Sequence, residues 1–325
     1  MKLKTLVALC LVLPFTLQAH THRPDYHAPI QVMGDHTHNT GEWMLSARMM
    51  SMSMNEIQNG KSVLSEDAFF EETSYMMAPK SMSMTMYMIG GMTALSDKVT
   101  VSAMLPLIQK EMTMVRKTDG AEIDRDTQGI GDAKLTTLIR LFSDKDSSAH
   151  WISGVSLPLG SITEETDGTR LGYGMQLGSG TPDIRNGLSF TRMQEEGSYG
   201  FQILTLLRPF KNKEGYSLGD EVSFTAWKAK VLSHSFSTSL RTNFKGWGGI
   251  KGSDGELNAM MSPGKSTTSG GELLDLSWGL NYIHQSGALK GHRLALEAGL
   301  PVYEQYHGYR LKTEWWATLG WQYTL

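Results

Sequence analysis

From Glu42 to the end of the chain, apolar and polar residues alternate in segments of about ten residues. A period of two is the geometry of a β-strand, because successive side chains point to opposite faces of a sheet. Strands of ordinary sheets are nearer five or six residues long, whereas a tilted strand needs about ten residues to cross the hydrocarbon of a bilayer. The alternation therefore predicts an all-β fold, a transmembrane antiparallel β-barrel. A periplasmic β-sandwich is the alternative.

The first 19 residues have the pattern of a secretory signal peptide: two lysines, an apolar run from Leu6 to Leu17, and Ala19 as a small residue for cleavage. Beyond them no run approaches the 18 apolar residues of a membrane helix, and a barrel also satisfies every peptide group in lipid. Cys10 lies within the leader, so we expect no disulfide in the mature chain. We expect residues 1–19 to be removed, 20–41 to form a histidine-rich periplasmic extension, and 42–325 to form the barrel.

The spacing predicts about twelve strands, with the N- and C-termini in the periplasm, because short and long connections alternate as they do in outer-membrane barrels. The longest predicted connections are 55–80, 115–129, 161–181 and 248–270. The predicted strands are 42–54, 81–93, 98–114, 130–142, 150–160, 182–193, 198–209, 217–230, 234–247, 271–284, 291–304 and 311–325.

Methionine is unusually frequent, with 21 residues, and it concentrates on one face of the first three predicted strands. In Ser81–Met92 it occupies every second position from Met82 to Met88. On the first strand methionine shares its face with Ser46 and Arg48. The polar face of a membrane barrel looks into the lumen, so we expect these thioethers to point inward.

Thioether sulfur is a soft, uncharged ligand that suits Cu(I) and needs no deprotonation. A row of weak sites would let an ion enter and leave. The alternative is that flexible methionines only fill the irregular interior of the barrel. The candidate metal ligands on the strands are Met50, Met52, Met54, Met82, Met84, Met86, Met88, Met112 and Met114.

A second candidate metal site lies at the amino terminus. Cleavage after Ala19 would leave His20 first and His22 third, and the amine, amide and imidazole nitrogens of such a terminus suit Cu(II) or Ni(II). His36 and His38 add another imidazole pair, with Asp35 beside it. The alternative is a solvated polar tail.

Charged residues on the predicted lumenal faces have mixed signs, which favours a salt-bridge network over a strongly ion-selective pore. They are Arg48, Asp132, Lys134, Arg140, Arg241, Asp275, Arg293 and Glu297. We expect no enzyme, because the mature chain has no GxSxG, P-loop, HExxH or CxxC motif. The close pairs His150 with Ser153 and His234 with Ser235 have no clear third partner.

Four glycine-containing stretches resemble outer-membrane barrels grouped under "meta-pathway of phenol degradation", a transporter-like family. They are GIGDAKL (129–135), SLPLGSI (156–162), LGSGTPDI (177–184) and GYSLGDEVS (215–223). The opening GDHTHNTGEWMLSARMM (34–50) is similar to a methionine- and histidine-rich branch associated with copper. The resemblance implies an outer-membrane barrel with a transport role and brings no catalytic residues. The closing Gly320, Tyr323 and Leu325 resemble the strand that barrel-assembly machinery recognises, with leucine in place of the usual terminal aromatic.

The sequence thus predicts a porin-like channel or transporter in the outer membrane of a Gram-negative bacterium. We expect a small solute as cargo, copper or another soft metal ion, and no required cofactor. One alternative is a channel for small hydrophobic or aromatic compounds, and another is a metal-sequestering protein without an open pore. The net charge of -3 and the pI near 6.4 give no reason to expect a nucleic-acid partner. Outer-membrane lipid and the barrel-assembly machinery are the other expected partners.

Overall fold

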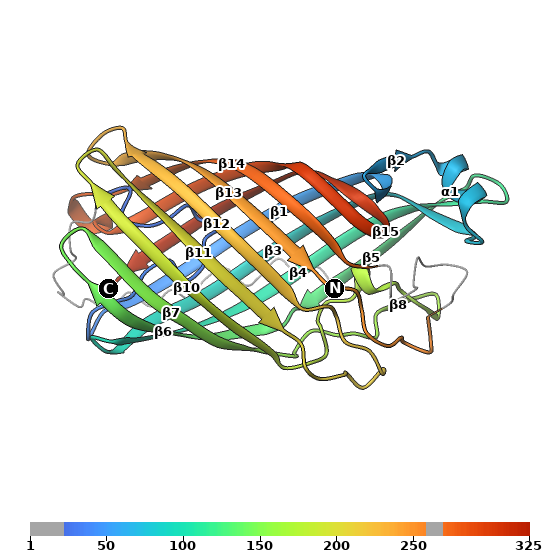
Figure 1. The fold of residues 1–325 in the computed structure, drawn as a ribbon, viewed down its shortest axis with the longest axis horizontal. Coiled ribbons are helices and arrows are strands. Elements are labelled where there is room, and N and C mark those ends of the chain that lie inside the picture. Colours follow the sequence, from blue (N-terminus) through green and yellow to red (C-terminus); the bar gives the residue numbers. More distant parts are fainter. Residues whose placement is uncertain (1–22, 258–268) are drawn as a thin grey trace.

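The computed structural model describes residues 23–257 and 269–325 and shows a closed antiparallel β-barrel (Figure 1). Neighbours in the sheet follow the order of the chain, and the last strand pairs with the first, which leaves the wall without an edge. The strands are β1 (Trp43–Gly60), β2 (Ser62–Leu64), β3 (Met77–Ser96), β4 (Val99–Arg116), β5 (Glu122–Ile130), β6 (Ala133–Ser143), β7 (Ser147–Leu157), β8 (Glu165–Thr166), β9 (Thr169–Arg170), β10 (Asp183–Gln194), β11 (Gly197–Leu207), β12 (Glu221–Val231), β13 (Phe236–Trp247), β14 (Gly271–Ile283) and β15 (His292–Thr324). The all-β barrel predicted from the alternation is confirmed.

Within the described part of the chain, eleven strands close the wall, and β2 and β5 lie outside that ring. β15 pairs with β14 from Arg293 to Tyr306 and with β1 from Tyr306 to Thr324. Its first part therefore lies beside β14, and its second part lies beside β1. It covers both of the predicted strands 291–304 and 311–325. The prediction of about twelve strands stays a prediction, and so does the periplasmic position of the termini.

The two faces of the wall differ as the alternation predicts. Leu240 and Ile89 point outward, with 67% and 63% of their surfaces exposed. Arg241, the next residue after Leu240, is buried in the interior, and Glu297 is fully buried there. A wall with large apolar side chains outside and charged side chains inside is the arrangement of a membrane barrel. This confirms the predicted assignment of faces for the strands.

The two ends of the barrel also differ (Figure 1). Short turns gather at the end where the C-terminus lies, and β2, the helix α1 (Glu66–Glu72) and the longer connections lie at the other end, called the loop end below. Ser65 caps α1 by accepting a hydrogen bond from the Ala68 amide, and Phe69 of α1 is buried. No helix among residues 23–257 and 269–325 is long and apolar enough to cross a membrane.

The predicted loop 115–129 is wrong, because most of it is strand β5, paired with the second half of β4. Glu122, Asp124 and Asp126 point outward and are exposed. β5 and the second half of β4 extend beyond the belt of apolar residues on the outer surface. The outer face of β5 is therefore polar, and its sequence shows no alternation of apolar and polar residues. β5 and β6 follow one another beside β4, which pairs with each along half its length.

The segment from Arg23 to Gly41, called the plug below, lies inside the barrel at the end with the short turns (Figure 1). It forms turns without helix or strand, so its carbonyl groups need other donors. Wall side chains supply them: the carbonyls of Pro24, Asp25, Ala28, Ile30, Met33 and Gly34 accept hydrogen bonds from Ser237, Ser198, Arg293, Arg48, Gln202 and His150 respectively. The expected histidine-rich extension therefore sits within the lumen, in its described part, instead of extending away from the barrel.

Candidate metal centre

Three side chains of the plug form a compact group of potential metal ligands. One ligand atom from each of His27, Asp35 and His36 lies within 4.8 Å of the others. Nδ1 of His36 is 2.9 Å from the Asp35 carboxylate, and Nδ1 of His27 is 3.7 Å from it, too far for a hydrogen bond. The ring of His38 lies 4.9 Å from that of His36. We call these four residues the histidine cluster.

Local geometry of the plug brings these residues together. The backbone amide of Ala28 donates a 2.9 Å hydrogen bond to Asp35, which closes a loop between them. Gly34 has a φ of +67°, a conformation that glycine adopts without strain, and it turns the chain just before Asp35. Thr100 of β4 accepts a 2.9 Å hydrogen bond from the His38 amide and fixes the far end.

Imidazole nitrogens in this cluster are buried without hydrogen-bond partners. They are Nδ1 of His27, Nε2 of His36 and Nε2 of His38. A buried polar atom without a partner costs about 1–3 kcal/mol. Three such atoms in one group are therefore a reason to look for a ligand that they share.

The protonation state suits a metal ion. Burial and the neighbouring His36 lower the pKa of His27 well below its ordinary value and that of His38 to about 4. Burial would raise the pKa of Asp35, but His36 and His27 hold it well below its ordinary value. The neutral imidazoles of His27 and His38 and the ionised carboxylate of Asp35 are the forms that bind metals.

Imidazoles with one carboxylate suit borderline ions such as Cu(II), Ni(II) and Zn(II). Bonds of about 2.0–2.2 Å would hold ligand atoms at most about 4.4 Å apart. The observed 4.8 Å spread requires only a small closure of the side chains.

The predicted methionines form a continuous row on the lumenal face of β1, β3 and β4. Register places Met50 opposite Met86, Met52 opposite Met84, Met54 opposite Met82, and Met82 opposite Met112. Directly opposed residues have Cβ atoms about 4.5–5.5 Å apart. We call these seven residues the methionine row.

Two members of the row have an evident packing role. Met54 and Met82 pack against the buried cluster of Ile57, Phe69, Ala78 and Leu311 at the loop end. Outside the row, Met88 lies opposite Arg48, and Met114 lies opposite Pro79. Met112, the remaining member, lies opposite the packed Met82. The thioethers left to line a path are those of Met50, Met52, Met84 and Met86.

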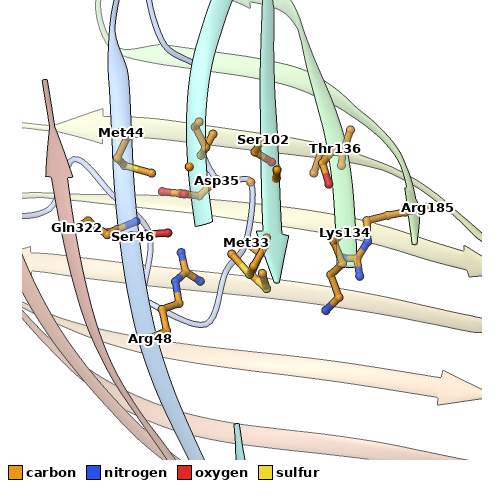
Figure 2. A pocket seen from close by; sticks show the side chains of 16 residues that line it. Met33, Asp35, Met44, Ser46, Arg48, Ser102, Lys134, Thr136, Arg185 and Gln322 are labelled. Carbon is orange, nitrogen blue, oxygen red and sulfur yellow. The ribbon is translucent and has the colours of Figure 1, made fainter. Parts of the chain in front are cut away.

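A cavity of about 40 Å³ separates the plug from the wall, and Asp35 of the histidine cluster reaches its edge (Figure 2). Four further methionines line it: Met33 of the plug, Met44 of β1, Met92 of β3 and Met104 of β4. Asp35 is therefore the member of the histidine cluster that borders these thioethers.

Comparison with known proteins bears on the fold. A scan of family models and a search of curated proteins find no match to this chain. Among solved structures, an outer membrane channel from Pseudomonas putida F1 matches with a TM-score of 0.62 at 10% identity, over 91% of this chain and 100% of that one. This chain has the fold of an outer-membrane β-barrel. The resemblance to the phenol meta-pathway group and its copper-associated branch stays a prediction.

Two other solved structures are less similar. The β domain of the Bordetella autotransporter BrkA matches with a TM-score of 0.46 at 12% identity, over 87% of this chain and 99% of that one. The NanC porin matches with a TM-score of 0.45 at 6% identity, over 86% of this chain and 100% of that one.

Most of the predicted lumenal charges of the outer-membrane barrel hold other groups in place. Arg241 and Glu297 form an ion pair of 2.6 Å. Arg140 binds the plug at Thr37 and at the His38 carbonyl. The predicted salt-bridge network is therefore in large part a set of contacts between wall and plug.

Of the three histidines in the cluster, only His36 and His38 are among the metal ligands predicted from the sequence. His20 and His22 lie outside the described residues, while His36 and His38 lie within the cluster. His27 was not selected, because it precedes Asp35 without any recognised ligand spacing. His150 binds the Gly34 carbonyl at 2.8 Å and so holds the plug. The prediction that the chain is not an enzyme stays a prediction.

Proposed function

We propose that this protein is an outer-membrane channel for a soft or borderline metal ion, with copper as the cargo. The observation that carries the proposal is the group of buried imidazole nitrogens without partners, held beside an ionised Asp35 inside the lumen. A metal ion bound by His27, Asp35 and His36 would give imidazoles of this group a partner. The barrel fold and the apolar outer face support a location in the outer membrane.

The candidate ligands lie along one path through the lumen. The histidine cluster lies in the plug, Asp35 borders the methionine-lined cavity, and the methionine row continues toward the loop end. Imidazole and carboxylate ligands suit Cu(II), and thioethers suit Cu(I). Weak sites in succession allow an ion to pass from one to the next.

Segments of the chain fold into the lumen at both ends, and we expect them to move when an ion passes. The plug lies at one end. At the other, the connection 158–182 folds inward, and Lys110 donates hydrogen bonds of 2.8 and 2.6 Å to the carbonyls of Gly174 and Gln176. Met175 of this connection is buried. Occupation of the histidine cluster would act on the first of these segments, because its ligands belong to the plug.

The proposal is tested with purified, refolded barrel. Isothermal titration with Cu(II), and with Ag(I) as a redox-inert analogue of Cu(I), measures binding; Ag(I) entry into liposomes measures passage. The double variant His27→Gln/His36→Gln should lose the Cu(II) site and slow Ag(I) entry. The matched control is His234→Gln/His307→Gln, which changes two exposed histidines outside the plug. Equal Cu(II) binding by both double variants would refute the metal centre.

The same assays separate the two alternative functions. The uncharged methionine row would also line a path for small hydrophobic or aromatic solutes, and entry of such solutes without Ag(I) entry would favour that channel. A plug that fills the lumen also fits metal sequestration. Binding of Cu(II) without any entry of Ag(I) would favour that alternative.

A further inference from the structure

Positive charge dominates the cavity between plug and wall (Figure 2). Lys134 of β6, Arg185 of β10 and Arg48 of β1 all line it. Among the described residues that line the cavity, Asp35 is the only carboxylate, and it is held by the Ala28 amide and by His36. The cavity is thus left with more positive than negative charge.

Lys134 and Arg185, called the cation pair below, have no hydrogen bond or ion pair to any residue in 23–257 or 269–325. Nearby acids bind other groups. Asp183 and Glu221 both bind Arg208, at 3.0 and 2.9 Å, and Asp132 accepts a 2.8 Å hydrogen bond from the Ser179 amide. Both cations are half-buried, and a charge that has lost part of its hydration is stabilised by a counter-ion. The cation pair therefore has no ion-pair partner of its own in the described protein, although the carboxylates of Asp132, Asp183 and Glu221 lie near enough for their charges to act on it.

Sheet register explains why the cation pair can meet. Gly154 of β7 lies opposite Thr136 on one side and opposite Arg185 on the other. A Cβ atom on Gly154 would lie 2.5 Å from the Leu135 carbonyl oxygen, so no side chain fits between them. The bare backbone leaves room for Arg185 to extend toward β6, where Lys134 projects into the same space (Figure 2).

Hydroxyl groups complete the lining. Ser102 and Thr136 lie directly opposite each other on β4 and β6, and both border the cavity. Neither hydroxyl is hydrogen-bonded to a described residue, so both are available as donors. Two cations and two free hydroxyls are donors that match an anion.

We infer that this cavity binds a small monovalent anion of the size of chloride or formate. A site for one water needs about 10–15 Å³ on the same scale, so a cavity of about 40 Å³ holds a few atoms and excludes sugar acids and phosphate esters. The guanidinium of Arg185 offers the paired N–H groups that a carboxylate accepts. The inference rests on the cation pair and stands whether or not the histidine cluster binds metal.

Bromide is the first probe, because its anomalous scattering locates it directly. Crystals of the full chain grown in gluconate and soaked in bromide should show an anomalous peak beside Lys134 and Arg185. In solution, protein in chloride should broaden the ³⁵Cl resonance, and formate should reverse the broadening while gluconate should not. Formate displacement separates a site that takes carboxylates from one that takes halides alone.

The double variant Lys134→Met/Arg185→Met should lose both the bromide peak and the excess ³⁵Cl line width. Lys228→Met/Lys230→Met is the control, because it removes two exposed lysines of β12. Heat-modifiable migration on gels verifies that each variant has folded, and the single variants Lys134→Met and Arg185→Met replace the double if it has not. A bromide peak elsewhere only, or line width unchanged by loss of the cation pair, would overturn the inference.

Discussion

The Glu297 carboxylate accepts a 2.9 Å hydrogen bond from the backbone amide of Gln31, a residue 266 positions earlier in the sequence. The same carboxylate pairs with Arg241 at 2.6 Å and accepts a hydrogen bond from Ser277 at 2.7 Å. Glu297 is fully buried, so its charge depends on these three partners. It therefore joins strands β13, β14 and β15 to the plug at one point.

Replacing Glu297 with glutamine should loosen the plug and destabilise the barrel. Removing one partner of a buried ion pair costs about 3–5 kcal/mol, because the other charge stays buried without compensation. Urea unfolding followed by gel migration should show the loss of stability, and proteinase K should cut residues 23–41 faster. Glu196→Gln, in an exposed turn, is the control and should behave like the wild type.

Gly320 and Ile30 supply a second test of the seated plug. A Cβ atom at Gly320 would lie 2.6 Å from Cγ1 of Ile30, whose side chain is buried against this point of β15. Gly320→Ala should therefore displace the plug and increase its cleavage. Adding Ile30→Ala should restore protection by making room, and a double variant that is cleaved more than Gly320→Ala would contradict this packing.

Lysine at Leu240 should destabilise the barrel in lipid. Leu240 lies mid-strand on the outer face with 67% of its surface exposed, and a lysine near the bilayer midplane costs about 2–4 kcal/mol. Folding titrations into liposomes measure the loss. Leu232→Lys, in the exposed turn after β12, should cost far less; equal costs would place Leu240 outside the hydrocarbon.

Exchanging the four path-lining methionines for leucine tests the thioethers apart from their bulk. The variant Met50→Leu/Met52→Leu/Met84→Leu/Met86→Leu should fold, because exchanges between leucine and methionine cost less than about 1.5 kcal/mol each. It should lose Ag(I) binding attributable to the row, as measured by titration. Met49→Leu, on the lipid face, should leave Ag(I) binding unchanged, and undiminished Ag(I) binding by the four-residue variant would leave the row with a packing role only.

Alternation along each strand was sufficient to predict which side chains face lipid and which face the lumen. That pattern depends only on the pleat of a strand, which is a local property of the chain. Leu240 and Arg241 occupy opposite faces for this reason, and Met84 and Met86 point inward for the same reason. Strand β5 was not predicted, because it lies beyond the apolar belt. Both of its faces meet water or polar groups, so its sequence lacks the alternation of apolar and polar residues.

Tertiary structure alone decided that the histidine-rich segment enters the barrel and that His27 meets Asp35 and His36. The segment has no periodicity, and its backbone is held by side chains such as Arg48 and Arg293 from opposite ends of the chain. Which donors satisfy an irregular backbone depends on the closed barrel bringing distant residues around it. The sequence by itself therefore determined the wall and its inner face, while closure of the wall decided what that face encloses.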